Sequence, residues 1–320
     1  MQTIIKKLAV PKVILRYITM SFTDIKTIEY LILNVKIMNV LDNYSKEILE
    51  KARHGFLWNC KKGNIMVAQW LYSTGNVNIH ADNEEAFRRA CHKGHLTVAK
   101  WLYVLGGVDI HAHNESAFGW SCCRGHLAVA KWLYSLGRVN IHVGDEYAFR
   151  NSCRNGHLIV AKWLYSLGQV NIHVCDEYAF AESCGEGHFD VAKWLYSLGQ
   201  INIHADNEGA FRWSCQSGHL TTIKWLYSLD KINIHDCDEY AFRASCKAGH
   251  LTVAKWLYSL GGVDIHVGDE SAFRESCCTG HLVVVQWLYS LGNVNIHACK
   301  EQAFRWSKGK ILNWLNTIKN

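Results

Sequence analysis

The chain of 320 residues carries eighteen histidines, and imidazole is a side chain that binds metals and exchanges protons near neutral pH. Fifteen of the histidines occupy two recurring positions, one in Gly-His steps and one in Ile-His steps. Equivalent histidines on adjacent packed helices lie about 8–10 Å apart, whereas the ligand bonds of a zinc ion are only about 2 Å long. The pattern therefore predicts histidines that build the fold, and no metal site.

The thirteen cysteines are the second group that could do chemistry. Eight of them form a row with a constant interval: Cys60, Cys91, Cys122, Cys153, Cys184, Cys215, Cys246 and Cys277. A disulfide needs Cα atoms within about 7 Å, which stacked repeats do not provide, so we expect small buried side chains. Cys175, Cys237 and Cys299 fall at expected loop tips.

Motifs for catalysis or membrane insertion do not stand out from the repeating pattern. We find no nucleophile elbow, phosphate loop or pair of catalytic carboxylates outside the repeat register, and therefore expect no enzyme and no cofactor. A formal charge of +6 is mild, and no apolar run approaches the roughly 18 residues of a membrane span. The start of the chain does not resemble a secretory signal, which together with the unpaired cysteines predicts a soluble protein of the cytoplasm.

The elements that position these residues are set by a period of 31 residues. The tryptophans with this interval are Trp70, Trp101, Trp132, Trp163, Trp194, Trp225, Trp256 and Trp287. The phenylalanines with it are Phe56, Phe87, Phe118, Phe149, Phe180, Phe211, Phe242, Phe273 and Phe304. A fixed period of this length indicates one structural unit stacked many times, with the tryptophans in the core between units.

Each unit is predicted to hold two helices and a short arm. Residues 83–93 show a helical stripe of small and aromatic side chains, and residues 96–105 show a wider apolar face. An Asn or Asp four residues before the Phe, such as Asn83, is expected to cap the first helix in all but the first and last copies, which carry Ala52 and Lys300, and a glycine such as Gly94 is expected to end it. Residues 77–80 alternate apolar with polar and predict a short extended arm.

This helix, Gly-His turn, helix and arm resembles the ankyrin repeat over about residues 46–310, through Gly-His-Leu, the x-Val-Ala-Lys-Trp-Leu-Tyr run and Gly-x-Val-Asn. Two features depart from that family: the Thr-Pro-Leu-His box is absent, and each unit is two residues shorter. The amino-acid sequence of the repeat also resembles that of the multi-copy ankyrin-repeat proteins of giant amoeba-infecting DNA viruses. The resemblance implies an all-α solenoid with short extended hairpin arms. Its expected parts are an N-terminal helical cap (1–45), eight repeats (46–300) and a C-terminal capping unit (301–320).

Variable positions are where such a fold can recognise a partner, and they lie on the first helix, opposite the Phe stripe. In the family this side lines the concave surface. The residues we expect to bind protein there are Trp120, Trp213, Tyr147, Tyr178, Tyr240, Arg89, Lys93, Arg124 and Arg154. Trp, Tyr and Arg dominate the binding energy of protein interfaces. The alternative for the tryptophans is that they only fill space between units.

Charges on the first helix follow two patterns. The first four units carry Lys61, Lys62, His92, Lys93, Arg124 and Arg154 toward the end of the helix, while the fifth carries Glu186, so one half of the face is expected to be basic. Arginine also follows Phe in six units, four residues after a glutamate, as in Arg88 and Glu84. We expect these pairs to form ion pairs within the helix.

The function predicted from this pattern is a non-enzymatic scaffold that binds a partner protein, a protein of the host cell if the source is viral. The chain is expected to act as a monomer without membrane contact. Two alternatives stay open. Residues 10–15 followed by Asp24-Ile25 faintly resemble an F-box start, which implies a substrate adaptor of a ubiquitin ligase. The basic half of the face could instead bind nucleic acid, which we do not expect.

Overall fold

The computed structural model describes residues 46–318, with side chains from residue 53 onward. The chain divides between Ala148 and Phe149 into two compact units, which are described separately. The expected N-terminal cap and its F-box-like stretch lie outside the described residues. Within the described range, no helix is long and apolar enough to cross a membrane.

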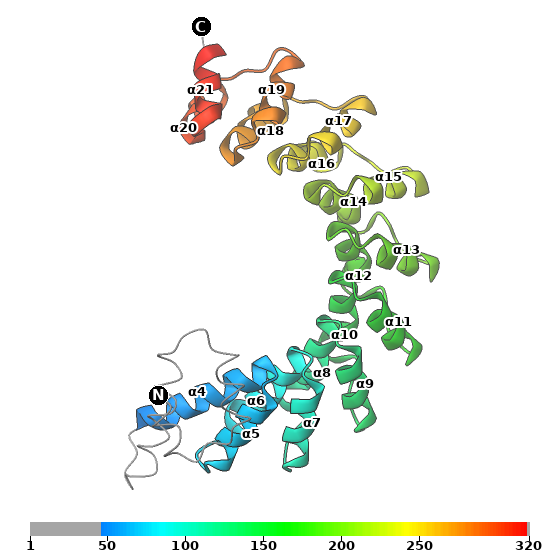
Figure 1. Ribbon diagram of the computed structural model, residues 1–320. Helices are drawn as coiled ribbons and strands as arrows, with labels where there is room; N and C mark the ends of the chain where they lie inside the picture. The colour runs from blue at the N-terminus through cyan, green and yellow to red at the C-terminus, as the bar shows by residue number, and fades with distance from the viewer. Residues whose placement is uncertain (1–45, 319–320) are drawn as a thin grey trace. The chain divides into compact units, whose positions relative to one another are not determined.

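The first unit contains three helix pairs and part of a fourth (Figure 1). The pairs are α4 (Lys46–Lys62) with α5 (Ile65–Ser73), α6 (Ala81–His92) with α7 (Leu96–Val104), and α8 (Ala112–Cys123) with α9 (Leu127–Ser135). Helix α10 (Val143–Arg154) begins in this unit and continues past the division. Each second helix packs on its own first helix, and the first helices α4, α6 and α8 pack on one another in chain order.

The second unit repeats the same arrangement. It contains α11 (Leu158–Ser166), α12 (Val174–Gly185), α13 (Phe189–Ser197), α14 (Ala205–Ser217), α15 (Leu220–Leu229), α16 (Asp236–Lys247), α17 (Leu251–Ser259), α18 (Val267–Thr279), α19 (Leu282–Ser290), α20 (Ala298–Trp306) and α21 (Gly309–Ile318). The first helices α12, α14, α16, α18 and α20 stack in that order. This confirms the predicted all-α solenoid of helix pairs.

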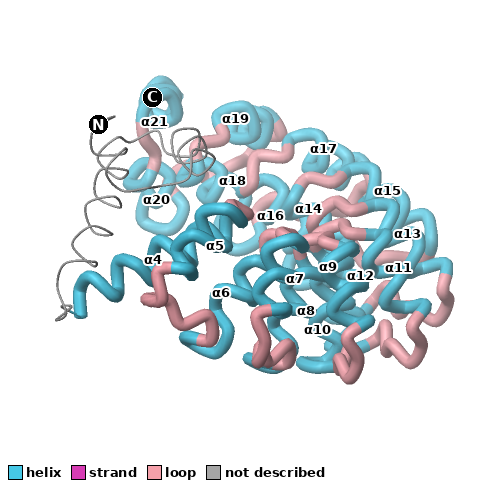
Figure 2. Tube along the Cα trace, turned by 60° about the horizontal axis from the view of Figure 1, so that its bottom comes forward, coloured by secondary structure: helices cyan, strands magenta, loops and turns pink. Residues whose placement is uncertain are grey.

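The arms between helix pairs are loops. Residues 76–78 have no regular structure and residues 79–80 form a turn that leads into α6, and no residue from 46 to 318 is assigned to a strand (Figure 2). The arm is therefore extended only over a few residues and does not pair into a β-hairpin. Asn78 Oδ1 accepts a hydrogen bond from the His80 amide (2.9 Å), which sets the turn.

The start of each first helix differs from the prediction. Asn83 does not cap α6, which begins earlier, after His80, without a side-chain cap. Instead Asp82, Asn83 and Glu84 have left-handed backbone angles, with φ of 52°, 52° and 63°. Asn and Asp recur at this position because their short polar side chains tolerate a positive φ. The same three-residue left-handed turn lies inside the other first helices, from α8 to α20.

The core follows the periodic residues. The phenylalanines from Phe56 to Phe273 are 1% exposed, and the eight row cysteines are buried beside them, as predicted. Five ladder tryptophans (Trp101, Trp132, Trp194, Trp225 and Trp287) pack on the Phe of the preceding helix pair, for example Trp132 on Phe87 (ring centroids 6.1 Å) and Trp225 on Phe180 (6.2 Å). These tryptophans thus lie between neighbouring helix pairs, as expected, but they are half-buried rather than fully inside the core.

Glycine and histidine meet where the first helix turns into the second. Gly94 has φ +77°, and a Cβ atom added to it would lie 2.5 Å from the ring of His126 in the next helix pair. The His95 ring, one pair earlier, hydrogen-bonds the Lys61 carbonyl (3.0 Å). The Gly-His step is therefore an interlock between neighbouring pairs, which explains why both residues keep the period.

Candidate interaction surface on the first helices

The first-helix face is defined here as the side of the first helices that lies opposite the Phe row. In the first unit it presents Trp58 and Trp120, with Lys62 Nζ 5.6 Å from the Trp58 ring centroid. The His92 ring lies 5.4 Å from the Trp120 ring. The guanidinium of Arg88, which is on the same helix as His92, lies 5.5 Å from the Trp120 ring centroid. Trp120 is half-buried, so it packs on the preceding helix pair and still reaches the surface.

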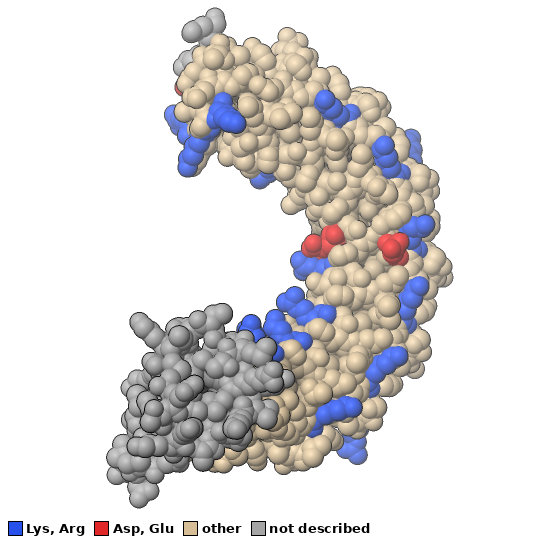
Figure 3. Space-filling view, viewed as in Figure 1, with Lys and Arg blue, Asp and Glu red and all other residues tan. Residues whose placement is uncertain are grey.

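The first unit carries a basic cluster on this face, formed by Lys62, Lys93 and Arg124. All three are exposed, and no ion pair between described residues involves them. Arg124 Nε donates a hydrogen bond to His92 Nε2 (3.1 Å). Burial lowers the pKa of His92, and the positive charges of Lys93 and Arg124 lower it further. Lys and Arg side chains gather over α6 and α8 in Figure 3.

Arg89 is the exception among the expected binding residues of this unit. Its guanidinium pairs with Glu85 (2.5 Å), four residues earlier on α6, and Glu85 also contacts Arg53 (3.6 Å). Part of its charge is therefore neutralised. The structure brings Arg89, Lys93, Trp120 and Arg124 onto neighbouring first helices, as the spacing predicts.

The second unit has a mixed-charge surface at the equivalent place. Arg154 pairs with Glu182 (3.2 Å) and Glu186 (3.5 Å) and donates a hydrogen bond to the Tyr178 hydroxyl (3.2 Å). The carboxylate of Glu182 is the main cause of a raised pKa of Arg154. Arg154 was expected to extend the basic half, but its charge is balanced by two acids, and acid side chains are visible beside a cation at this level in Figure 3.

Trp213 lies in the same part of the second unit. A Cβ atom added to Gly185 would lie 3.0 Å from Trp213 Cβ, so the tryptophan packs closely on the preceding first helix. Arg154, Glu182, Glu186, Trp213 and Gln216 line a shallow pocket of ≈ 260 Å³. The Tyr240 hydroxyl donates to Gln216 Oε1 (3.0 Å). Arg154 and Trp213 thus line one hollow in the second unit, Tyr178 contacts Arg154, and Tyr240 contacts Gln216.

Another hollow, in the first unit, brings together Trp120 and Tyr147, the last of the expected residues. Trp120 and Tyr147 line a pocket of ≈ 300 Å³ together with Gly119 and the left-handed turn of α8. Tyr147 is 36% exposed. The sequence offered Trp120 and Tyr147 as separate surface residues, and the structure places them at one opening.

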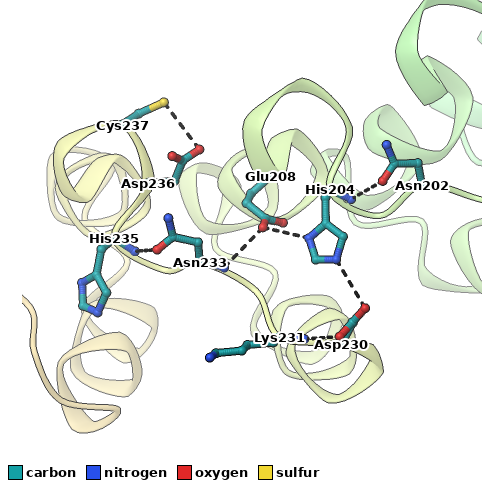
Figure 4. Close-up of polar contacts among 9 residues, drawn as sticks. All are labelled: Asn202, His204, Glu208, Asp230, Lys231, Asn233, His235, Asp236 and Cys237. Carbon is teal, nitrogen blue, oxygen red and sulfur yellow. Dashed lines mark hydrogen bonds and ion pairs between the residues drawn. The ribbon is translucent and has the colours of Figure 1, made fainter.

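The glutamates of the first helices have other partners than predicted. Glu84 Oε1 accepts from His80 Nδ1 (2.9 Å), not from Arg88. In the second unit Glu208 Oε1 accepts from His204 Nδ1 (2.8 Å) and from the backbone amide of Asn233 (3.3 Å), which belongs to the following arm (Figure 4). Because of the left-handed turn, the glutamate does not lie on the same helix face as the arginine four residues later. The Ile-His histidines are therefore architectural, as expected, with a specific partner.

The arginines that follow Phe also correct the prediction. Arg88 donates from Nε to the Asn83 carbonyl (2.7 Å) and from Nη2 to the Asp82 carbonyl (2.9 Å), so it holds the left-handed turn instead of an ion pair. Arg243 and Arg274 make the same pair of contacts in the second unit. Carbonyls in this turn point away from the helix axis, where a guanidinium fork can reach two of them.

Most of the described cysteines are buried. Burial raises the pKa of the Cys60 thiol to about 12, and it raises the pKa of Cys91 and Cys153 further. Such thiols stay protonated and are poor nucleophiles. Cys175, Cys237 and Cys299 are exposed, but they lie in the left-handed turns of α12, α16 and α20 and not at the loop tips where they were expected. No group of three metal-binding side chains occurs among the residues that the structure describes.

Comparison with known proteins bears on the fold. The sequence matches none of the protein-family models and none of the curated proteins with which it was compared. Its structure is similar to the crystal structure of the human ASB11 ankyrin repeat domain, at 17% sequence identity and a TM-score of 0.48. The likeness covers 65% of this chain and 97% of that chain.

The histidines of the first unit predict a pH dependence of stability. The pKa values of His92 and His126 are lowered, chiefly by burial. As the pH falls below the unfolded value of about 6.5, the unfolded chain therefore takes up protons that the folded chain does not, and stability decreases. His204 acts in the opposite sense, because Glu208 raises its pKa.

Urea denaturation followed by circular dichroism at pH 7.5 and pH 5.5 tests this expectation. The midpoint should be lower at pH 5.5. A His92→Gln/His126→Gln chain should lose less stability on acidification than the wild type, and His204→Gln should lose more. If all three chains lose the same stability between pH 7.5 and pH 5.5, these histidines do not cause the pH dependence.

Proposed function

We propose that this chain is a non-enzymatic scaffold that holds a partner protein against the first-helix face. The observation that carries the proposal is Trp120, a half-buried ring on that face that is flanked by His92 and Arg88 and opens on a pocket. An aromatic side chain held rigidly beside a hollow, with exposed cations around it, has the composition of an interface hot spot.

The cations of the basic cluster indicate the charge of the partner surface. Lys62, Lys93 and Arg124 are exposed and surround the aromatic residues, as charged residues do at the rim of an interface. Rim charges act mainly on the rate of association. The favoured partner surface in the first unit is therefore an apolar or aromatic patch with acidic groups at its edge.

Other parts of the proposal follow from the sequence. Residues 1–45 and 301–320 are proposed as caps of the repeat array, and the chain is proposed to act as a monomer in the cytoplasm, that of the host cell if the source is viral. The resemblance of the repeat to ankyrin proteins supports a protein as partner. An adaptor role for residues 1–45 in a ubiquitin ligase remains the alternative, and deleting them would then abolish co-purification of a ligase subunit.

Replacing Trp120 tests the proposed surface. With a partner isolated by affinity purification from the native host cell, Trp120→Ala should weaken binding by about 2 kcal/mol, or roughly 30-fold. Because the ring also packs on His92 and Arg88, we expect a stability loss of about 1 kcal/mol. Dissociation constants come from calorimetry, and stability comes from urea denaturation of the same preparations.

Tyr103→Ala is the matched control. Tyr103 is a partly exposed aromatic residue (38%) on a second helix, where it packs on Trp132. It should leave partner affinity unchanged. If Tyr103→Ala weakens binding and Trp120→Ala does not, the partner binds the second helices and the proposal is wrong. Binding that collapses between about 50 and 200 mM salt would instead favour nucleic acid.

A further inference from the structure

The column of residues that directly follows the core phenylalanines is nearly uniform. Its arginines are Arg88, Arg150, Arg212, Arg243, Arg274 and Arg305. In the repeats from Phe87 onward the column is interrupted twice, by Gly119 after Phe118 and by Ala181 after Phe180. These interruptions were visible in the sequence, but their meaning depends on what the arginines contact.

Arginines of this column join neighbouring helix pairs. The forks of Arg88, Arg243 and Arg274 each donate to two carbonyls of their own left-handed turn, as in Arg88 with Asn83 and Asp82. The guanidinium of several arginines also reaches the next first helix. The contacts there are Arg150 over Tyr178 (4.9 Å), Arg212 over Tyr240 (5.1 Å), Arg88 over Trp120 (5.5 Å), and Arg243 with the hydroxyl of Ser271 (3.4 Å).

Helix α8 keeps the surroundings of this arginine without the arginine. His113 and Asn114 hold the same positions in its left-handed turn as Asp82 and Asn83 do in α6, with φ of 55° and 57°. Tyr147 holds the position of Tyr178 and Tyr240 on the following helix. Gly119 supplies no side chain between them. The turn, the glycine and the tyrosine line the pocket of ≈ 300 Å³, close to the lower limit of about 300 Å³ for small-ligand pockets.

Ala181 does not have the same surroundings. The residue opposite it, at the position of Tyr147, is Gly209, so both the cation and the aromatic platform are missing there. Only the interruption at Gly119 pairs a missing arginine with a retained tyrosine. The junction of α12 and α14 therefore serves as a control for the junction of α8 and α10, because it lacks the arginine and the facing tyrosine together.

The lining of the pocket includes the carboxylate of Glu115 and no Lys or Arg, although the Arg88 guanidinium lies 5.5 Å from the ring of Trp120, which also lines the pocket. Glu115 is 8% exposed, and its Oε1 accepts from His111 Nδ1 (2.8 Å) and the Asn140 amide (3.2 Å). Its other oxygen, Oε2, is buried without a hydrogen-bond partner, as is Oε2 of the equivalent glutamates from Glu84 to Glu270. A buried carboxylate is stabilised by a nearby positive charge that excludes water from the same space.

We propose that this pocket binds the guanidinium of an arginine side chain presented by the partner protein. The fork would donate to the carbonyls of His113 and Asn114, and its plane would lie over Tyr147, as the chain's own arginines do elsewhere. Lysine fits less well, because a single ammonium cannot reach two carbonyls and stack on a ring at once. The pocket adjoins Trp120, so this inference rests on the proposed function and specifies one contact of it.

The binding of short peptides to the full chain tests the pocket without any partner. The probes are acetyl-Gly-Arg-Gly-amide and the same peptide with lysine or citrulline in the middle, titrated by isothermal calorimetry and by NMR chemical-shift changes. The arginine peptide should bind saturably, and the other two should bind about tenfold or more weakly. Citrulline keeps the shape of arginine without the charge, so it separates the electrostatic contribution from fit.

Three variants locate the site. Gly119→Arg should fill the pocket with the chain's own guanidinium and abolish peptide binding, while its melting temperature stays at or above that of the wild type, because six other repeats carry arginine there. Tyr147→Leu should weaken binding without unfolding the chain. Ala181→Arg, in the repeat without a facing tyrosine, should leave peptide binding unchanged.

Each result decides between occupants. Equal affinity for the arginine and lysine peptides, or undiminished binding to folded Gly119→Arg, would overturn the proposal. If Gly119→Arg loses the peptide but keeps full partner affinity, the scaffold function stands and the partner arginine is wrong. If the peptide binds and Trp120→Ala leaves partner affinity intact, the pocket stands and the proposed function fails.

Discussion

Replacing Phe180 by alanine is expected to lower the free energy of unfolding by about 3–5 kcal/mol, because it leaves a cavity between two helix pairs. Phe180 is 1% exposed and packs on Trp225, whose ring centroid lies 6.2 Å away. Deletion of a fully buried aromatic ring costs both the transfer free energy of the ring and the contacts that its neighbours lose. Urea denaturation followed by circular dichroism measures the change.

The partner of Phe180 serves as the comparison. Trp225 is half-buried and lies against Phe180, Phe189 and Tyr196 of the preceding pair. Trp225→Ala should therefore cost less than Phe180→Ala, at about 2 kcal/mol, since water already reaches part of the ring. If the tryptophan variant is the less stable of the two, the core of each pair is formed by the ladder tryptophans and not by the phenylalanines.

The second large effect is expected at the buried glutamates. Glu208→Ala should lower the free energy of unfolding by about 2–4 kcal/mol, because it removes the acceptor for both the His204 ring and the Asn233 amide. The Asn233 amide belongs to the next arm, so the substitution also loosens the junction between two helix pairs. Amide hydrogen exchange at Asn233 should become faster, which a purely local effect in α14 would not produce.

Two further variants test whether the loss of stability depends on the acceptor oxygen and on burial of the carboxylate. Glu208→Gln keeps one acceptor oxygen and should recover part of the loss. Glu301→Ala removes the equivalent residue of the last first helix, where the side chain is 50% exposed and the His297 contact is longer (3.4 Å). That substitution should cost no more than about 1 kcal/mol. Equal losses at Glu208 and Glu301 would show that burial of the carboxylate does not matter.

The helical content of the fold was predictable because it depends on local periodicity. Phe87 and Cys91 lie four residues apart and face the same side of one helix, so their spacing alone indicates a buried stripe. Stacking repeats this stripe every 31 residues, which makes the core residues and the architectural role of the histidines readable from the chain. The exposed first-helix face was predictable for the same reason, as the side that the stripe leaves.

The polar contacts were not predictable in this way. Glu84 sits four residues before Arg88, which indicates an ion pair only if the backbone between them is helical. Three left-handed residues precede the helix proper, so Glu84 meets His80 and the guanidinium meets carbonyls instead. A positive φ at Asp82 and Glu84 leaves no hydrophobic pattern in the sequence, so periodicity cannot reveal it.

The sequence by itself determined the repeat, its two helices and the rows that fill the core, because each depends on spacing within one helix or on a constant interval between copies. The tertiary structure alone decided that Arg154 is neutralised by Glu182 and that Gly119 faces Tyr147 across a pocket. Both contacts join residues of successive helix pairs, 28 positions apart in the chain. How two side chains meet across such a junction depends on the offset between stacked helices, which no spacing within a single helix specifies.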